Sequence, residues 1–368
     1  MDRKYHQIDG SHLEGGGQIL RIATVLSSLL NIPIEVNNIR AGRPKPGLAA
    51  QHLHGLWMAR DITNAELINA EIGSTSIRYR PTKITAGQYE TDVRTAGSVT
   101  LILQTAIPLL LYANGKSTIE LRGGTHVPFA PFVNFFTDIL PDYLPFMKQI
   151  QIHLNRFGFY PQGGGHISCQ IDRKTSLPLE PIERIDFGEL IEIDGFVMIS
   201  GRIQRSIAEA NIRSAMKIFQ NPQNFHKDII KPIAINECHT RNDVLAIMLT
   251  GRTTTNCHLS SSTIVSRRNE ILNSNDDYGG KVAEKLCQQL QQKCCVDEFV
   301  QDQLIIYMAL ANGISRIITG DITLHTETAI WITEQMTGVR FSIKSISNSL
   351  KMIECNGIGY MMEKFYPM

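Results

Sequence analysis

A threefold repeat along the sequence restricts the possible fold more than any other feature. Each copy contains a segment with apolar residues at helical spacing, a β-branched strand-like segment, a turn and a second helical segment. The copies begin near Gly17, Gly97 and Phe299, and strand-rich sequence with turn signals follows each second helix. Repeated units of this kind predict an α/β fold, in which three repeated α/β units form one large domain of pseudo-threefold character.

Residues 182–286 interrupt this repeat. The segment contains strand-like runs such as IDGFVMIS and helical runs such as AEANIRSAMKIFQN and KVAEKLCQQL. A chain of 368 residues is longer than one compact domain usually is, so a second unit is expected. We therefore predict a smaller α/β domain at 182–286, inserted into a large domain formed by residues 1–181 and 287–368.

Composition argues against several classes of protein. Seven cysteines without a CxxC pair indicate reduced thiols, rather than a disulfide framework or a zinc site. The N-terminal sequence lacks the apolar segment of a signal peptide, and the longest apolar run, Val99 to Ala113, is too short to span a bilayer. These features predict an intracellular protein with no membrane partner. The net charge of +1 means that a nucleic-acid enzyme would need its cations gathered locally.

Three turns occupy equivalent places in the three units, namely Arg40 to Gly47, Arg122 to Pro131 and Gly320 to Glu327. Functional groups of α/β folds gather in the loops at the carboxyl ends of strands. If the units pack around a common axis, these turns meet at one site.

The third turn carries His325 just before a helix. The positive end of a helix dipole disfavours the imidazolium form and leaves a ring nitrogen free for nucleophilic attack. Taken alone, however, a histidine at a helix start is more often a cap or a surface residue, so the residue type does not decide its role.

Two other segments contain groups suited to phosphate. The first turn offers Arg40 and Arg43, and arginine binds phosphate bidentately, although a solvated loop explains the same residues. The string EGGGQ opens the first helix. Its glycines let backbone N–H groups approach an anion and Glu14 could hold a divalent cation, but glycine runs also serve plain turns.

A third candidate is a helix face near the C-terminus. Phe299, Asp302 and Gln303 share this face at i, i+3, i+4 spacing, where they could stack on and hydrogen-bond a purine. A core phenylalanine beside a helix-start carboxylate explains the pattern as well, and the chain has neither a P-loop nor a GxGxxG after a strand. The residues alone therefore indicate an α/β protein with phosphate-binding turns.

At these motifs the sequence resembles the RNA 3′-terminal phosphate cyclase family, especially its eukaryotic members. The matching strings are IDGSHLEGGGQILR, IRAGRPKPGL followed by QHL, TAGSVTLILQT, LRGGT, GFYPQGGG, VDEFVQDQLIIYMALANG and TLHTETAI. They cover roughly residues 8–172 and 296–359, while the inserted segment resembles the family weakly. The resemblance implies repeated α/β units with a smaller domain inserted before the last unit.

The resemblance also implies a reaction and a set of site residues. Family members use ATP with Mg²⁺ or Mn²⁺ to convert an RNA 3′-phosphate end into a 2′,3′-cyclic phosphate, through AMP attached first to a histidine and then to the RNA. Carried over position by position, the implied roles are nucleophile for His325, adenylate binding for Gln104, Pro131, Phe299, Asp302 and Gln303, metal and phosphate binding for Glu14, and ATP or RNA phosphate binding for Arg21, Arg40 and Arg43. Position 299 is Phe where relatives often have Tyr, which keeps stacking and loses a hydroxyl.

Two alternatives compete with this interpretation. A non-catalytic branch of the superfamily acts in ribosome assembly as a binding protein, but it lacks the nucleophilic histidine that His325 would supply. An enolpyruvyl-transferase-like enzyme would share repeated α/β units in outline, without the strings TLHTETAI or EGGGQILR. The eukaryotic resemblance favours the nucleus, with the cytoplasm as the alternative, and the sequence does not indicate an oligomeric state.

Overall fold

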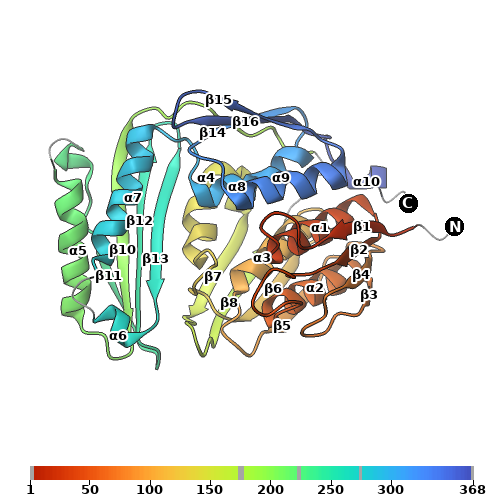
Figure 1. Cartoon of the computed structure of the whole chain (residues 1–368), viewed down its shortest axis with the longest axis horizontal. Helices are drawn as coiled ribbons and strands as arrows, with labels where there is room; N and C mark the ends of the chain where they lie inside the picture. The colour runs from red at the N-terminus through yellow and green to blue at the C-terminus, as the bar shows by residue number, and fades with distance from the viewer. Residues whose placement is uncertain (1–3, 173–177, 222–224, 273–275, 366–368) are drawn as a thin grey trace.

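The computed structural model describes residues 4–172, 178–221, 225–272 and 276–365. Helices and four small mixed sheets alternate along the described chain, as Figure 1 shows. This arrangement confirms the predicted α/β class. Among the described residues, no helix combines the length and the apolar character needed to cross a membrane.

Three of the sheets share one topology. In each, two parallel strands are followed by two antiparallel pairings, and the third and fourth strands in chain order are exchanged in space. In spatial order, the first sheet contains β1 (His6–Asp9), β2 (Ile34–Asn37), β4 (Ile77–Arg80) and β3 (Glu66–Ile68); the second contains β5 (Gln88–Asp92), β6 (Ser117–Gly123), β8 (Gly165–Ile171) and β7 (Ile150–Arg156); the third contains β9 (Glu183–Arg184), β14 (Ile314–Thr319), β16 (Lys351–Asn356) and β15 (Phe341–Ser345). The repeat seen in the sequence is thus a repeat of sheet topology.

Each of these sheets is accompanied by a pair of helical segments. The pairs are α1 (Gly17–Leu30) with α2 (Ala50–Thr63), α3 (Val99–Leu110) with the π-helical turn η1 (Phe135–Ile139) and α4 (Leu140–Tyr143), and α8 (Glu298–Leu310) with α9 (Leu324–Thr337). Helix α1 packs against α2, α3 and α9, so helices of all three units meet in the middle of the molecule. Two short elements follow the helices of the second and third units: the 3₁₀ turn η2 (Pro145–Gln149) and α10 (Met362–Phe365).

The second unit differs from the sequence-based expectation in its helices. The string FVNFFTDIL predicts a regular helix, but the structure has the π-helical turn η1 followed by one turn of α-helix. The Leu140 N–H donates to the carbonyl of Phe135, five residues back, and Pro141 then occupies the first turn of α4, where a proline is tolerated. Likewise α3 stops at Leu110, shortly after Pro108, rather than continuing to Ala113.

The fourth sheet lies within the segment predicted to be inserted. Its spatial order is β11 (Ala234–Cys238), β10 (Leu190–Ser200), β12 (Val244–Thr253) and β13 (His258–Val265). Figure 1 shows this sheet beside α5 (Arg205–Phe219) and α7 (Tyr278–Gln292), which pack on each other at one end of the molecule. The segment also contains η3 (Lys227–Ile229) and α6 (Arg268–Ile271). Strand β9 pairs with β14, so the start of the segment is attached to the third sheet.

Candidate active site

A cavity of about 990 Å³ opens where the starts of α1, α8 and α9 face the loop after β6 and strands β12 and β13. The ten site residues carried over from the sequence all line it: Glu14, Arg21, Arg40, Arg43, Gln104, Pro131, Phe299, Asp302, Gln303 and His325. Residues from all three predicted turns are present, as a common axis requires. The structure therefore brings the candidates together, while the role of each stays a prediction.

His325 is the second residue of α9, one step inside the helix rather than just before it. Thr323 caps the helix by accepting the Thr326 N–H at 3.1 Å. The Nδ1 atom of His325 lies 3.1 Å from Oε1 of Gln18, and Nε2 of Gln18 donates to Asp302 at 2.7 Å. Because the Gln18 amide turns its NH₂ group to the carboxylate, its oxygen must accept from His325, which puts the proton on Nδ1. Nε2 of His325 is then left with a free lone pair.

Asp302 lies beside hydrogen-bond donors and a cation. Its second oxygen accepts from Nε2 of Gln303 at 3.1 Å. Burial raises the pKa of Asp302 to about 6, against the lowering effects of the Gln303 hydrogen bond, of the neighbouring His325 ring and of the Arg21 guanidinium. Burial also lowers the pKa of Arg21 to about 10, which leaves the guanidinium charged at neutral pH. The cavity thus contains a permanent positive charge next to a carboxylate.

The EGGGQ string places a second carboxylate at the cavity. Glu14 forms an ion pair with Arg43 through Oε1, while its Oε2 is buried without a hydrogen-bond partner among the described residues. A Cβ atom at Gly16 would collide with the Glu14 carboxylate, so a larger residue there would force that side chain to move. Glu14 consequently presents one unsatisfied carboxylate oxygen near the start of α1.

Part of the Arg40 side chain is hydrogen-bonded within its own loop. Its Nη1 donates to the carbonyl of Lys45 at 2.9 Å and to that of Gly47 at 2.8 Å, and Arg40 itself has a φ of 53°. The side chain therefore stabilises the first turn as well as facing the cavity, whereas Arg43 turns toward Glu14.

The residues expected to hold an adenine come from three elements. Gln104 lies on α3, Pro131 follows β6, and Phe299 is in the first turn of α8. The Pro131 carbonyl accepts the Thr100 hydroxyl at 2.8 Å, which anchors this loop on α3. A flat ring between Phe299 and Pro131 would meet an aromatic face and a rigid apolar edge.

The sequence is similar to a family of known proteins. A sequence model described as RNA 3′-terminal phosphate cyclase matches residues 12–343. The RNA 3′-terminal phosphate cyclase of Drosophila melanogaster is 37% identical over 359 residues, covering 97% of this chain and 98% of the relative. The chain belongs to the RNA 3′-terminal phosphate cyclase family. A probable RNA 3′-terminal phosphate cyclase of Dictyostelium discoideum is 35% identical over 96% of this chain and 83% of that protein.

Members of the cyclase family are also found among archaea with similar coverage. The RNA 3′-terminal phosphate cyclase of Pyrobaculum neutrophilum is 34% identical over 96% of this chain and 99% of the relative. A solved enolpyruvyl transferase, NikO of Streptomyces tendae, aligns with 52% of this chain and 34% of its own at 14% identity and a TM-score of 0.24, which is too low to support any argument. Family membership therefore rests on sequence.

In this cyclase-family chain, the fourth sheet forms a wall of the cavity that sequence reasoning missed. Met248 of β12 and Ser260, Ser262, Thr263 and Ile264 of β13 line it. No motif in the sequence indicated these positions, because strand residues reach the cavity only through the packing of this sheet on the rest of the chain.

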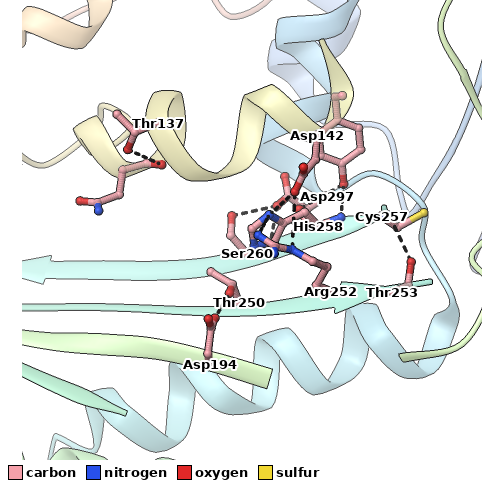
Figure 2. A network of polar contacts seen from close by, with 12 residues as sticks. Thr137, Asp142, Asp194, Thr250, Arg252, Thr253, Cys257, His258, Ser260 and Asp297 are labelled. Carbon is pink, nitrogen blue, oxygen red and sulfur yellow. Dashed lines mark hydrogen bonds and ion pairs between the residues drawn. The ribbon is translucent and has the colours of Figure 1, made fainter. Parts of the chain in front are cut away.

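A polar network joins the two parts of the chain beside that wall (Figure 2). The buried Asp297 carboxylate caps α8 by accepting the N–H groups of Phe299 and Val300, and it also accepts the N–H and the hydroxyl of Ser260 at 2.7 and 2.9 Å. Nearby, His258 of β13 lies 2.8 Å from Asp142 of α4. Asp297 thus fixes the start of α8 and strand β13 to each other.

Two further cavity residues on α1 and α2 were also missed. Gln18 lies within the quoted EGGGQ string, and its i, i+3 spacing to Arg21 was a signal that both face one side of α1. Burial, with the charges of Arg21 and Arg40, lowers the pKa of His52 to about 3, so this histidine is neutral. Its Nδ1 accepts the Ala49 N–H at 3.2 Å, which assigns the proton to the other ring nitrogen.

Proposed function

We propose that this chain converts an RNA 3′-terminal phosphate into a 2′,3′-cyclic phosphate, with ATP as co-substrate and AMP carried on His325. One observation supports the proposal above the others: His325 lies on the cavity wall with its Nδ1 atom held by Gln18. A histidine fixed in this way presents Nε2 as a nucleophile of defined direction.

The proposed first step is attack of Nε2 of His325 on the α-phosphorus of ATP. A nitrogen–phosphorus bond forms, the bond from the α-phosphorus to the bridging oxygen breaks, and pyrophosphate leaves. Adenine would lie between Phe299 and Pro131, and Arg21 would balance negative charge that builds up on phosphoryl oxygens. The histidine-bound AMP keeps the free energy of ATP cleavage available for the next transfer.

In the second and third steps the RNA end takes part. An oxygen of the RNA 3′-phosphate attacks the phosphorus of the histidine-bound AMP, which returns the electron pair to Nε2 of His325. The neighbouring 2′-hydroxyl then attacks the 3′-phosphorus and loses its proton, AMP leaves, and the cyclic phosphate remains. Because the 2′-hydroxyl is the attacking group, the substrate must end in a ribonucleotide.

A divalent cation, Mg²⁺ or Mn²⁺, would be held by Glu14. The free Oε2 of that carboxylate fits the role, and Mg²⁺ commonly binds one or two carboxylates together with substrate phosphates. Among the described residues there is no group of three or more His, Cys, Asp or Glu side chains placed to hold a metal. When bound, the cation would supply charge compensation for the phosphates of ATP.

The test of this proposal is a cyclisation assay. The purified chain is mixed with ATP, magnesium and an RNA labelled at its 3′-terminal phosphate, and the label is then exposed to phosphatase. We expect ATP-dependent protection of the label in the wild type and in His153→Ala, a control at an exposed histidine on β7, and none in His325→Ala. RNA binding without any protection would favour the non-catalytic binding protein instead.

The proposal includes a location. The resemblance to eukaryotic family members supports the nucleus, and microscopy of the tagged chain in a eukaryotic cell would test it, with exclusion from the nucleus as the contrary result.

A further inference from the structure

Phe129 occupies an unusual position in the loop between β6 and η1. Its side chain is fully exposed, and its φ of 63° lies in the left-handed region that glycine or asparagine normally takes. Pro128 precedes it, and the loop turns at these two residues. A large apolar ring in this backbone conformation has an energetic cost, and such costs concentrate at functional positions.

The exposure of Phe129 does not arise from a loosely attached loop. On one side, the buried Val127 and the His126 ring, which lies 3.1 Å from the Asn134 side chain, fix the chain. On the other side, the Thr100 hydroxyl holds the Pro131 carbonyl at 2.8 Å. The turn is anchored at both ends while the ring of Phe129 stays uncovered, and Phe129 lines the cavity that contains His325.

The position of the ring relative to the predicted adenine site indicates what covers it. Phe299 is partly buried, whereas the ring of Phe129 is wholly uncovered and therefore lies at the open side of the cavity. If His325 carries AMP, the 3′-terminal nucleotide of the RNA must enter from the open side to place its phosphate against that AMP. An unpaired base that enters in this way can stack on an exposed aromatic ring.

We propose that Phe129 is a stacking platform for the 3′-terminal nucleobase of the RNA substrate. This inference rests on the function proposed above. Stacking uses the flat face that every base has, so the platform accepts all four bases and adds affinity without reading sequence. Phe129 would thus act in RNA binding and take no part in the attack of His325 on ATP.

The direct test measures RNA binding without requiring catalysis. A short single-stranded RNA with a 3′-phosphate and 2-aminopurine as its terminal base reports stacking by loss of fluorescence. We expect Phe129→Ala to weaken binding about 5- to 150-fold and to abolish the quenching, the range that corresponds to loss of one base–aromatic stack. Phe129→Leu keeps an apolar side chain at the same positive φ but has no flat ring, so it should behave like Phe129→Ala. Phe129→Trp keeps an aromatic ring and should bind the RNA about as well as the wild type.

A second RNA makes the assignment to the terminal base specific. With an RNA that lacks only its terminal base, wild type and Phe129→Ala should bind equally, because the lost partner is already absent. Unequal binding to this RNA, or unchanged binding of the complete RNA by Phe129→Ala, would overturn the inference.

A control distinguishes the RNA from ATP. The KM for ATP in RNA-free labelling of the protein should be the same in Phe129→Ala and wild type, and a raised KM would assign the ring to the adenine site and contradict the inference. If the wild type quenches the terminal base through Phe129 but forms no cyclic phosphate, the proposed reaction fails while the platform stands.

Discussion

At the scale of single residues, the contact between Gln18 and His325 has the clearest chemical consequence. An imidazole that is hydrogen-bonded at Nδ1 can rotate little, and only its Nε2 is available for attack. The Gln18 amide is itself fixed by the Asp302 carboxylate at 2.7 Å. A neutral amide therefore connects the His325 imidazole to a partly buried carboxylate without giving up a proton of its own.

This relay predicts that Gln18→Leu slows adenylylation of the protein about 10- to 100-fold, as when a partner that orients a reactive histidine is lost. The labelled protein is measured over time with ATP alone. Gln151→Leu, at an exposed glutamine on β7, serves as the control for loss of an amide. An unchanged rate in Gln18→Leu would show that the hydrogen bond does not orient His325.

The raised pKa of Asp302 predicts a pH dependence of stability. Because the folded pKa is about 6 and the ordinary pKa of an aspartate is 3.8, the native state binds more protons between these values, and stability falls as the pH rises through this window. Asp302→Asn does not titrate. The difference between the Tm of the variant and the Tm of the wild type should therefore shift in favour of the variant as the pH rises from about 4 to about 7. The titratable groups near Asp302 are Arg21, His325 and Asp297.

Thermal unfolding at several pH values checks this prediction. A constant difference in Tm across the range would mean that Asp302 titrates normally in the folded state, and that the carboxylate is solvated at the cavity wall.

At the scale of elements, sequence periodicity predicts local structure well and its interruptions less well. The apolar spacing predicts α1 and α8, although both helices are buried on most sides rather than on one face. It fails at η1, where the hydrogen bonds shift to π-helical register before α4 begins. Periodicity records which face is buried, whereas the hydrogen-bond register also depends on individual residues.

The link between β13 and α8 shows what the sequence cannot indicate. Ser260 and Asp297 are 37 positions apart. Asp297 belongs to the string VDEFVQDQLIIYMALANG, but Ser260 belongs to none of the matching strings. Their contact depends on how the fourth sheet packs on the rest of the chain, so the wall that this sheet gives to the cavity follows from tertiary packing alone.

We predict that Asp297→Ala lowers the free energy of unfolding by about 2 to 4 kcal/mol, because it removes a helix cap and leaves the buried Ser260 N–H without an acceptor. The KM for ATP should also rise, because the backbone N–H of Phe299 donates a hydrogen bond to this carboxylate and would lose its acceptor. Denaturant unfolding and RNA-free adenylylation measure the two effects.

Ser260→Ala is the control, because it removes only one hydroxyl and should lower the free energy of unfolding by about 1 kcal/mol. Equal losses of unfolding free energy in the two variants would contradict the claim that Asp297 fixes the start of α8 as well as Ser260.

At the scale of the whole molecule, the chain has a net charge of only +1. The cavity lining is balanced as well, because the three arginines Arg21, Arg40 and Arg43 share it with the three carboxylates of Glu14, Glu298 and Asp302. Attraction of a polyanion would therefore come from single arginines that contact phosphates rather than from a net positive field.

This distribution predicts that Arg43→Ala weakens RNA binding and makes it less dependent on salt. If Arg43 contacts one RNA phosphate, the slope of log K against log salt should become shallower by about one unit. Binding is measured at several salt concentrations. Arg340→Ala, an exposed arginine outside the cavity, is the control and should leave the slope unchanged. An unaltered slope in Arg43→Ala would show that Arg43 contacts no RNA phosphate and only pairs with Glu14.

The candidate site could be predicted from the sequence to the extent that its residues belong to repeated turns. Equivalent turns of three units meet at one axis, so His325, Arg43 and Pro131 come together once the repeat is recognised. The orientation of His325 could not be predicted in this way, because it depends on a side-chain contact with Gln18 across 307 positions of sequence.

The central claim is that His325 carries AMP, and RNA-free labelling of the protein tests it most directly. The purified chain is incubated with magnesium and ATP labelled at the α-phosphate, and the label on the protein is then measured. We predict an adduct that is labile in acid, stable in base and absent in His325→Ala. Labelling that persists in His325→Ala, or no labelling under any metal and pH condition, would contradict the account.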